Sequence, residues 1–211
     1  MHCVIFSGGT ISRSTLVRSA IKQADFIIAA DGGAESALRM GIVPGVVIGD
    51  FDSVSPKTMR KLEKKQATLL KFPQEKDETD TELALDYAIK HKATDITILG
   101  GNNGDRFDHV IANLLLATTS KVSVKFINGN QVMWIEKGPI IRTISGKKGD
   151  LLSLIPLLGD VKGVTLEGLQ YGLKNETLAF GKPRGVSNVF LGKKASVQFA
   201  KGLLLIVYTS V

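Results

Sequence analysis

The hydrophobic and polar residues of the chain follow two different patterns, and the change comes near residue 128. In the first part, short apolar runs alternate with segments whose apolar residues recur at helical spacing. This alternation predicts a mainly parallel sheet with helices between its strands. The predicted strands cover 2–6, 26–30, 46–48, 67–71, 96–99 and 122–127. The predicted helices cover 12–23, 34–40, a segment that starts at Ser55-Pro56, 79–91 and 107–118.

The second part of the chain contains only short strand patterns. It begins after Asn128-Gly129, a dipeptide typical of hairpin turns. The predicted strands cover 131–135, 140–145, 151–155, 161–166, 186–190, 195–199 and 203–208. We therefore expect two domains: an α/β domain with a mainly parallel sheet over residues 1–128, and a small antiparallel β sandwich or barrel over residues 129–211.

Composition narrows the class of protein. The chain has 211 residues, of which 44% are hydrophobic and 22% charged, as in ordinary globular domains. No apolar run reaches the roughly 18 residues that a membrane helix needs, and the first residues lack the pattern of a signal peptide. The single cysteine, Cys3, lies in an apolar run, which indicates a buried side chain without a disulfide and favours the cytosol.

The formal net charge of +7 raises the question of nucleic-acid binding. The lysines are scattered in small clusters, and no aromatic residues lie between them as stacking platforms. We therefore interpret the charge as solvated surface that also helps to attract a polyanionic substrate, and we expect no nucleic-acid or membrane partner.

Several carboxylates come just after predicted strands. Asp31 follows 26–30, Asp50 and Asp52 follow 46–48, and Asp105 and Asp108 follow 96–99. In open α/β sheets the ligand site lies at the carboxyl ends of the strands. Acids that converge there repel one another unless a cation lies among them, and oxygen ligands suit Mg²⁺. Individually, each is also compatible with an ordinary turn.

Three local motifs carry this chemistry. Gly49–Ser53 places an acid pair directly after a strand, although the haloacid-dehalogenase phosphatases carry a similar Asp-x-Asp loop. Lys76–Asp80 places charged groups at a helix start, where free N–H groups favour anions. Gly100–His109 has glycines that let the backbone approach phosphate and an arginine that binds phosphate with two donors. It is neither a Walker A loop nor a Rossmann fingerprint.

These motifs, in this order, resemble the thiamine pyrophosphokinase family. The family carries Asp-Gly-Gly, Gly-Asp-Phe-Asp-Ser, an acidic Thr-Asp segment and Gly-Gly-x-x-Gly-x-Arg-x-Asp-His. The chain matches them at 31–33, 49–53, 76–80 and 100–109. A Gly-Leu-x-aromatic segment and a later Ser-Asn also match, at 168–171 and 187–188.

The resemblance implies an enzyme that moves a pyrophosphoryl group from ATP onto the hydroxyl of thiamine, with Mg²⁺ on the acid cluster. It also implies a three-layer α/β catalytic domain over residues 1–128 and a β-sandwich domain over residues 129–211 that binds thiamine and dimerises. The resemblance further implies a homodimer with thiamine at the subunit interface. The resemblance implies that the metal is bound by Asp50, Asp52, Asp77 and Asp80. It implies that these four acids also take part in the transfer reaction, together with Thr79, Arg106 and Asp108. The implied contacts to ATP are Asp31, Gly32, Gly33, Ser53, Lys76, Gly100, Gly101, Arg106 and His109. The implied contacts to thiamine are Tyr171, Ser187 and Asn188.

Two positions depart from the family pattern. Many members have Trp where Tyr171 stands, and some have Gln where Lys76 stands, so Lys76 is expected to serve phosphate. Asp77 and Asp80 are equal candidates for the group that accepts the hydroxyl proton.

Two other functions fit parts of the pattern. A haloacid-dehalogenase-like phosphatase would use Asp50 as nucleophile, but that family places its acid pair after the first strand. A nucleotide sensor without activity would use the second domain for signalling. Turnover of ATP and thiamine separates both from the transferase.

Overall fold

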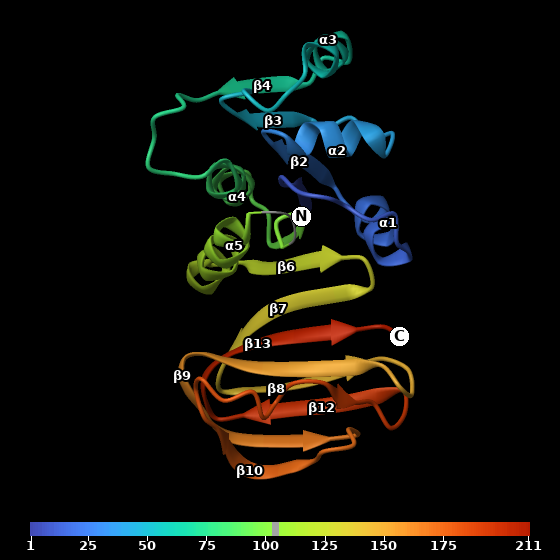
Figure 1. Cartoon of the computed structure of the whole chain (residues 1–211), viewed down its shortest axis with the longest axis vertical. Coiled ribbons are helices and arrows are strands. Elements are labelled where there is room, and N and C mark those ends of the chain that lie inside the picture. Colours follow the sequence, from blue (N-terminus) through green and yellow to red (C-terminus); the bar gives the residue numbers. More distant parts are fainter. Residues whose placement is uncertain (103–105) are drawn as a thin grey trace. The chain divides into compact units, whose positions relative to one another are not determined.

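The computed structural model describes residues 1–102 and 106–211. It divides into two compact units, Met1–Gly129 and Asn130–Val211 (Figure 1). No helix within the described residues is long and apolar enough to cross a membrane.

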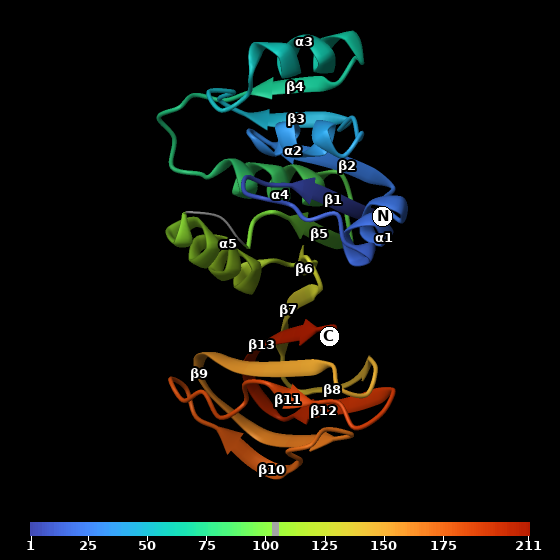
Figure 2. The same ribbon diagram turned by 45° about the vertical axis from the view of Figure 1, so that its right-hand side comes forward.

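The first unit is a three-layer α/β domain. Its sheet has the strand order β4-β3-β2-β1-β5-β6, and every pair of neighbours is parallel. Figures 1 and 2 show α1, α2 and α3 on one side of this sheet and α4 and α5 on the other. The strands are β1 (His2–Phe6), β2 (Phe26–Ala30), β3 (Val46–Gly49), β4 (Thr68–Lys71), β5 (Asp95–Leu99) and β6 (Ser123–Asn128). The helices are α1 (Thr15–Lys22), α2 (Gly33–Arg39), α3 (Pro56–Lys64), α4 (Asp80–Lys90) and α5 (Phe107–Thr119).

The strand order reverses at β1. The chain builds the sheet outward from β1 to β4, and then crosses back through α4 to place β5 on the other side of β1. A crevice forms at such a switch point, outside the carboxyl ends of the two strands. The loops that follow β1 and β5 therefore meet at the position where α/β sheets bind ligands.

Glycine makes the close approaches at this end of the sheet possible. A Cβ on Gly33, the first residue of α2, would lie 2.0 Å from the carbonyl oxygen of Phe6. Gly100 has φ +87°, and its Cβ would lie 2.9 Å from the carbonyl oxygens of Ser7 and Gly8. No side chain fits in either place, so these residues allow the loops to pack on the end of β1.

Side-chain caps begin three of the helices. Ser14, Ser55 and Thr79 accept hydrogen bonds from Val17, Thr58 and Glu82 respectively, which satisfies free N–H groups of the first turn. The predicted starts at Ser55-Pro56 and Thr79 are confirmed. The predicted helix 12–23 is too long at its start, because the Ser14 cap sets the first turn at Thr15.

The second unit is all β. Its strands are β7 (Gln131–Lys137), β8 (Ile140–Ser145), β9 (Leu151–Glu167), β10 (Leu173–Leu178), β11 (Asn188–Val189), β12 (Lys194–Phe199) and β13 (Lys201–Thr209). The order is β7-β13-β9-β12-β8, with β10 and β11 also paired to β9, and all these pairs are antiparallel.

One long strand replaces two predicted ones. The predicted strands 151–155 and 161–166 are parts of β9, which bends where Leu158 has φ 58° and Gly159 has φ 136°. The part before the bend pairs mainly with β13 and β11, and the part after it with β10 and β12. Gly159-Asp160, a typical turn sequence, lies in the gap between the two predicted strands.

Two further strand predictions in this unit need correction. β10 has no predicted counterpart, because its sequence Leu-Lys-Asn-Glu-Thr-Leu is mostly polar. The predicted strand 186–190 shrinks to β11, Asn188–Val189, because the chain leaves the extended conformation at Ser187, which has φ 59°.

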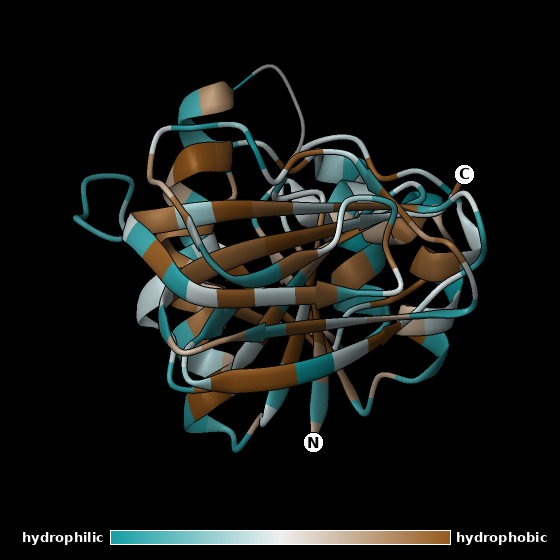
Figure 3. Ribbon diagram, turned by 90° about the horizontal axis from the view of Figure 1, so that it is seen from below, coloured by the Kyte–Doolittle hydropathy of each residue, from teal (hydrophilic) through white to brown (hydrophobic). Residues whose placement is uncertain are grey.

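The sheet formed by β7, β13 and the first half of β9 is apolar on both faces. Trp134, Leu154 and Ile206 lie on the face that packs into the buried core. The opposite face carries Met133 of β7, Val207 of β13 and Ile155 of β9. Met133 and Val207 are direct cross-strand partners, and Ile155 lies diagonally across from Val207. Figure 3 shows how the hydrophobic residues gather along the strands.

Burial and hydrogen bonding explain the pKa shifts of two buried groups, the thiol of Cys3 and the carboxyl group of Asp150. Cys3 is fully buried in β1, and burial raises the pKa of its thiol to about 12, so it is an inert core residue as expected. Asp150 is 1% exposed and accepts hydrogen bonds from Tyr208 Oη, Lys147 N (2.7 Å) and Val211 N (3.1 Å). Burial opposes ionisation, but these donors hold the pKa of Asp150 below its usual value.

The Asp150 cluster generates a prediction about stability. A lowered native pKa contributes stability above the unfolded value of about 4, and this contribution is lost as the pH falls through the native pKa. We expect Asp150→Asn to lower the free energy of unfolding by about 1–3 kcal/mol at pH 7, because buried donors lose a charged acceptor. The penalty should shrink near pH 3.

Denaturant titrations at both pH values check this, with the fluorescence of Trp134 as the probe, because it is the chain's one tryptophan and packs against the core of this unit. Glu167→Gln, an exposed carboxylate of the same unit, is the matched control. A penalty for Asp150→Asn that is the same at both pH values would contradict the role given to its charge.

Candidate active site

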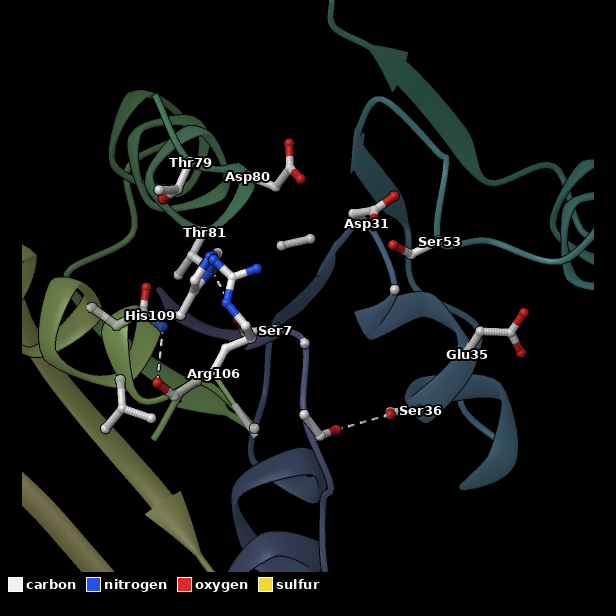
Figure 4. A pocket seen from close by; sticks show the side chains of 18 of the residues that line it. Ser7, Asp31, Glu35, Ser36, Ser53, Thr79, Asp80, Thr81, Arg106 and His109 are labelled. Carbon is white, nitrogen blue, oxygen red and sulfur yellow. Dashed lines mark hydrogen bonds between the residues drawn. The ribbon is translucent and has the colours of Figure 1, made fainter. Parts of the chain in front are cut away.

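A pocket of about 610 Å³ lies in the α/β unit at the carboxyl ends of the strands. It contains the switch point, because the segments after β1 and β5 both line it (Figure 4). The segments after β2 and β3, the start of α4 and residues of α2 and α5 complete the wall. The lining residues at these places include Gly8, Gly9, Asp31, Gly32, Ser53, Lys76, Thr79, Asp80, Gly100, Gly101, Arg106 and His109.

Three carboxylates from two strand ends form a group beside this pocket, of which Asp31 lines the pocket and Asp50 and Asp52 do not. Asp31, Asp50 and Asp52 each offer a carboxylate oxygen, and these oxygens lie within 4.8 Å of one another. Asp31 follows β2 and Asp50 follows the neighbouring strand β3, so the parallel pairing of these strands brings them together. Gly49 permits the contact, since it has φ +153° and its Cβ would lie 2.9 Å from Cβ of Asp31.

Asp31 is the most buried member of this group. Its residue is 9% exposed and has φ 41°, and its Oδ1 atom is buried without a hydrogen-bond partner among the described residues. Burial raises the pKa of Asp31, and the nearby charges of Asp80 and Asp50 raise it further, although hydrogen bonds with Gly32 and Ser53 act in the opposite direction. A buried, unsatisfied carboxylate oxygen beside two other acids is a suitable ligand for a cation.

Local hydrogen bonds hold the other two acids. Asp50 Oδ1 accepts from the backbone N of Asp52 at 3.1 Å. Asp52 in turn accepts from Ser53 Oγ at 2.8 Å and from Gln74 Nε2 at 3.2 Å. The intervening Phe51 has φ 68°, so the chain turns sharply between the two acids.

The segment before α4 places one of its two predicted acids in the pocket. Lys76 Nζ lies 3.1 Å from Asp80 Oδ1, and both residues line the pocket. Asp77 is exposed and does not line it. Neither Asp77 nor Asp80 joins the group of Asp31, Asp50 and Asp52, and Thr79 uses its hydroxyl to cap α4.

The loop after β5 combines glycines with a charged pair. Gly100 and Gly101 are buried and line the pocket, and their N–H groups donate no hydrogen bond to another described residue. Arg106 and Asp108 form an exposed ion pair at 2.6 Å, whose hydrogen bonds lower the pKa of Asp108 to about 2. His109 is exposed and donates its backbone N–H to the carbonyl oxygen of Arg106. Asn103, Gly104 and Asp105 of the predicted motif lie outside the described residues.

The three predicted thiamine contacts lie in the β unit and differ in character. Tyr171 is 64% exposed, so it is not a core aromatic residue. Asn188 is 5% exposed and holds the backbone of Tyr171 with two hydrogen bonds, at 2.9 Å to its N–H and 2.7 Å to its carbonyl oxygen. Ser187 is exposed and donates its backbone N–H to Ser153 Oγ. Asn188 therefore orients Tyr171 and has little surface of its own.

Several lining residues were not predicted from the sequence. Ser7 and Thr81 form a buried hydroxyl pair at 2.7 Å between the end of β1 and the first turn of α4. Glu35 accepts from Ser55 N at 2.9 Å and so connects α2 to the start of α3. The other unpredicted residues that line the pocket include Ser36, Arg39, Gln74, Glu78, Val110 and Asn113. For Asn113, the available signal was a polar residue within an otherwise apolar helix. For Ser7, it was a polar residue directly after a strand.

Comparisons with known proteins agree with this geometry. Residues 17–127 match the family model described as thiamin pyrophosphokinase, catalytic domain, and residues 140–204 match thiamin pyrophosphokinase, vitamin B1 binding domain. The thiamine pyrophosphokinase of Bacillus subtilis is 32% identical over 185 residues, which cover 85% of each chain.

Solved structures give the same result. The crystal structure of the Bacillus subtilis enzyme superposes with a TM-score of 0.89 at 27% identity, over 100% of this chain and 99% of that one. The yeast thiamin pyrophosphokinase has the same fold, with a TM-score of 0.81 at 18% identity, over 99% of this chain and 86% of that one. Because its two matched segments account for most of its length and share their fold with these structures, the chain belongs to the thiamin pyrophosphokinase family.

Proposed function

We propose that the chain transfers the pyrophosphoryl group of ATP to the hydroxyl of thiamine, with thiamine diphosphate and AMP as products. The observation that carries this proposal is the meeting of Asp31 and two glycine loops in one pocket, with Asp50 and Asp52 beside Asp31, in a chain of this family. Acids suit a metal ion, and glycine loops suit phosphate. The single cysteine, which is buried, supports the cytosol as the compartment.

The acid group fits Mg²⁺. Asp31 supplies a buried oxygen without a partner, and Asp50 and Asp52 supply oxygens close to it. When bound, Mg²⁺ would balance the negative charge of the phosphates and the charge that develops on the leaving AMP. We assign the metal to Asp31, Asp50 and Asp52, so Asp31 joins the predicted ligands, and Asp80 is a further carboxylate in the pocket whose charge acts on Asp31.

The other pocket residues would position the phosphates. Transfer of a phosphoryl-type group depends on alignment and charge more than on covalent chemistry by the protein. The N–H groups of Gly100 and Gly101 and the cations of Lys76 and Arg106 are donors suited to phosphate oxygens. Asp80 lines the pocket and Asp77 does not, which supports Asp80 as the acceptor of the hydroxyl proton.

Thiamine would bind against Tyr171 across a dimer interface. Thiamine is a cation, and the exposed ring of Tyr171 offers it a face for cation–π contact. The apolar outer face of β7, β13 and β9 supports a homodimer, because an extended apolar surface of this kind usually has a partner. This proposal gives the β unit two tasks, thiamine binding and dimerisation.

The products test the reaction itself. Attack at the β phosphorus of ATP gives AMP, whereas an ordinary kinase gives ADP and a phosphatase gives free phosphate. We expect phosphorus NMR of a reaction with ATP, Mg²⁺ and thiamine to show AMP and thiamine diphosphate in equal amounts. ADP together with thiamine monophosphate would refute the pyrophosphoryl transfer and leave the nucleotide site intact.

The acid group is tested by removing its charges singly. Asp50→Asn and Asp52→Asn should each lower kcat at least about 100-fold, the scale of losing a positioned electrostatic group. Both should fold normally because they lie in a loop. Mn²⁺ binding, followed by electron paramagnetic resonance, should weaken in parallel, which separates a metal role from other effects on turnover.

The matched control is Asp86→Asn, an exposed acid on α4 outside the pocket. Near-normal turnover and unchanged Mn²⁺ binding in both loop variants would show that the metal assignment is wrong.

Tyr171 is tested through the substrate constants. Tyr171→Ala should raise the KM for thiamine about tenfold, the scale of one cation–π and stacking contact, and leave the KM for ATP nearly unchanged. Because the ring is 64% exposed, thermal stability should hardly change. Tyr171→Phe keeps the ring and should behave like the wild type. A thiamine KM that stays the same in Tyr171→Ala would remove this residue from the site.

A mixing experiment tests the shared site. If Tyr171 of one subunit serves the acids of the other, heterodimers of Tyr171→Ala and Asp52→Asn contain one intact site. With thiamine well below the wild-type KM, where the Tyr171→Ala homodimer is itself about tenfold less active, heterodimer activity should recover to about half of the wild-type level, provided that subunits exchange. Verified heterodimers without recovery would place both halves of the site in one chain.

A further inference from the structure

The orientation of α5 is unusual for an apolar helix. Asn113 alone is buried among the residues of α5, all of which the structure describes. Phe107, Ile111 and Leu115, spaced four residues apart, are 72%, 41% and 47% exposed. Burying an amide is unfavourable unless it is hydrogen-bonded, so the packing of Asn113 in place of an apolar neighbour requires a reason.

The contact of Asn113 supplies that reason. Its Nδ2 donates to the carbonyl oxygen of Gly101 at 2.8 Å, and both residues line the pocket. Asn113 is 5% exposed, so little water competes for this bond. The hydrogen bond therefore joins α5 to the glycine loop at the wall of the ligand site.

The loop is confined on its other sides by close packing. A Cβ on Gly101 would lie 2.9 Å from Cγ2 of Ile98 and 3.1 Å from Nδ2 of Asn113, and a Cβ on Gly100 would lie 2.9 Å from carbonyl oxygens of Ser7 and Gly8. Glycines make this packing possible, but they also leave the backbone free to rotate. Packing alone thus leaves the direction of the Gly101 carbonyl to be set by its hydrogen bond.

That direction matters for an anionic ligand. In a trans peptide the C=O and the following N–H point in opposite directions, so a rotated Gly101 peptide would turn a carbonyl oxygen to a different side of the loop. A phosphate is attracted by N–H groups and repelled by a carbonyl oxygen. Because the carbonyl oxygen of Gly101 accepts a hydrogen bond from the buried amide of Asn113, it is not free to turn toward the phosphates.

We propose that Asn113 is a positioning residue for the phosphate-binding loop: its amide fixes the Gly101 carbonyl so that the loop presents its N–H groups to the nucleotide. This inference rests on the proposed function for the identity of the ligand as ATP. Asn113 acts through Gly101 and touches no reacting atom.

The test uses a change of almost identical shape. Asn113→Asp keeps the size of the side chain but replaces the donor with a second acceptor that repels the Gly101 oxygen. We expect the Kd for ATP with Mg²⁺, measured by calorimetry without thiamine, to rise at least about tenfold, the scale of losing one positioned hydrogen bond to a charged group. The KM for ATP should rise in parallel, and the KM for thiamine should stay within about twofold.

Two further variants keep the result interpretable. Gln23→Glu makes the same amide-to-carboxylate change at the end of α1, outside the pocket, and should bind ATP like the wild type. Asn113→Ala removes the donor without adding charge, and should also weaken ATP binding, which separates loss of positioning from repulsion between the new carboxylate and the phosphates.

The outcomes separate this inference from the proposed function. A wild-type protein that binds ATP but does not convert thiamine refutes the function, while the ATP titrations still test Asn113. A lower melting temperature with an unchanged Kd and KM for ATP, in folded Asn113→Asp and Asn113→Ala, would show that Asn113 only stabilises α5 and would overturn the inference.

Discussion

Repulsion among Asp31, Asp50 and Asp52 is the interaction around which the α/β unit is organised. Carboxylate oxygens within 4.8 Å of one another repel each other, and the repulsion is strongest at Asp31, which is buried. The fold overcomes this with parallel pairing of β2 and β3, with a glycine at 49 that leaves room for Asp31, and with the hydrogen bonds on Asp50 and Asp52. Glu35 adds a tie from α2 to the start of α3, directly after the acid loop.

Much of the α/β unit was predictable because its signals are local. Each parallel strand is a short apolar run. Ser55-Pro56 and Thr79 indicate helix starts, because the side chains of Ser55 and Thr79 accept hydrogen bonds from N–H groups of the first helical turn. Most acids and glycines of the site follow strands, so the rule for the carboxyl ends of a parallel sheet predicts that they lie at one edge of the sheet, as Asp31, Asp50 and Asp52 do. The family resemblance then supplied the chemistry that spacing alone left open.

The pocket residues that escaped prediction depend on contacts between distant segments. Ser7 meets Thr81 across 74 residues, and the amide of Asn113 reaches back to a carbonyl 12 residues earlier. No periodicity indicates which polar residue of an element will face inward, because that depends on how the element packs. In the same way, Asp31 was predicted among the acids at this edge of the sheet but was assigned to ATP, and the register of β2 against β3 places its carboxylate beside Asp50 and Asp52.

Sequence signals were weakest in the β unit, and β9 shows why. A turn-like Gly-Asp in its middle does not end the strand, since neighbours on both sides of the bend continue to pair with it. Seventeen residues of one backbone thus belong to both layers of the unit. Because the single strand β9 runs through both layers, neither layer can separate from the unit or exchange with another chain while the other layer stays folded. Slow amide exchange should consequently extend through both layers as a single cooperative block, with β9 as its most protected element.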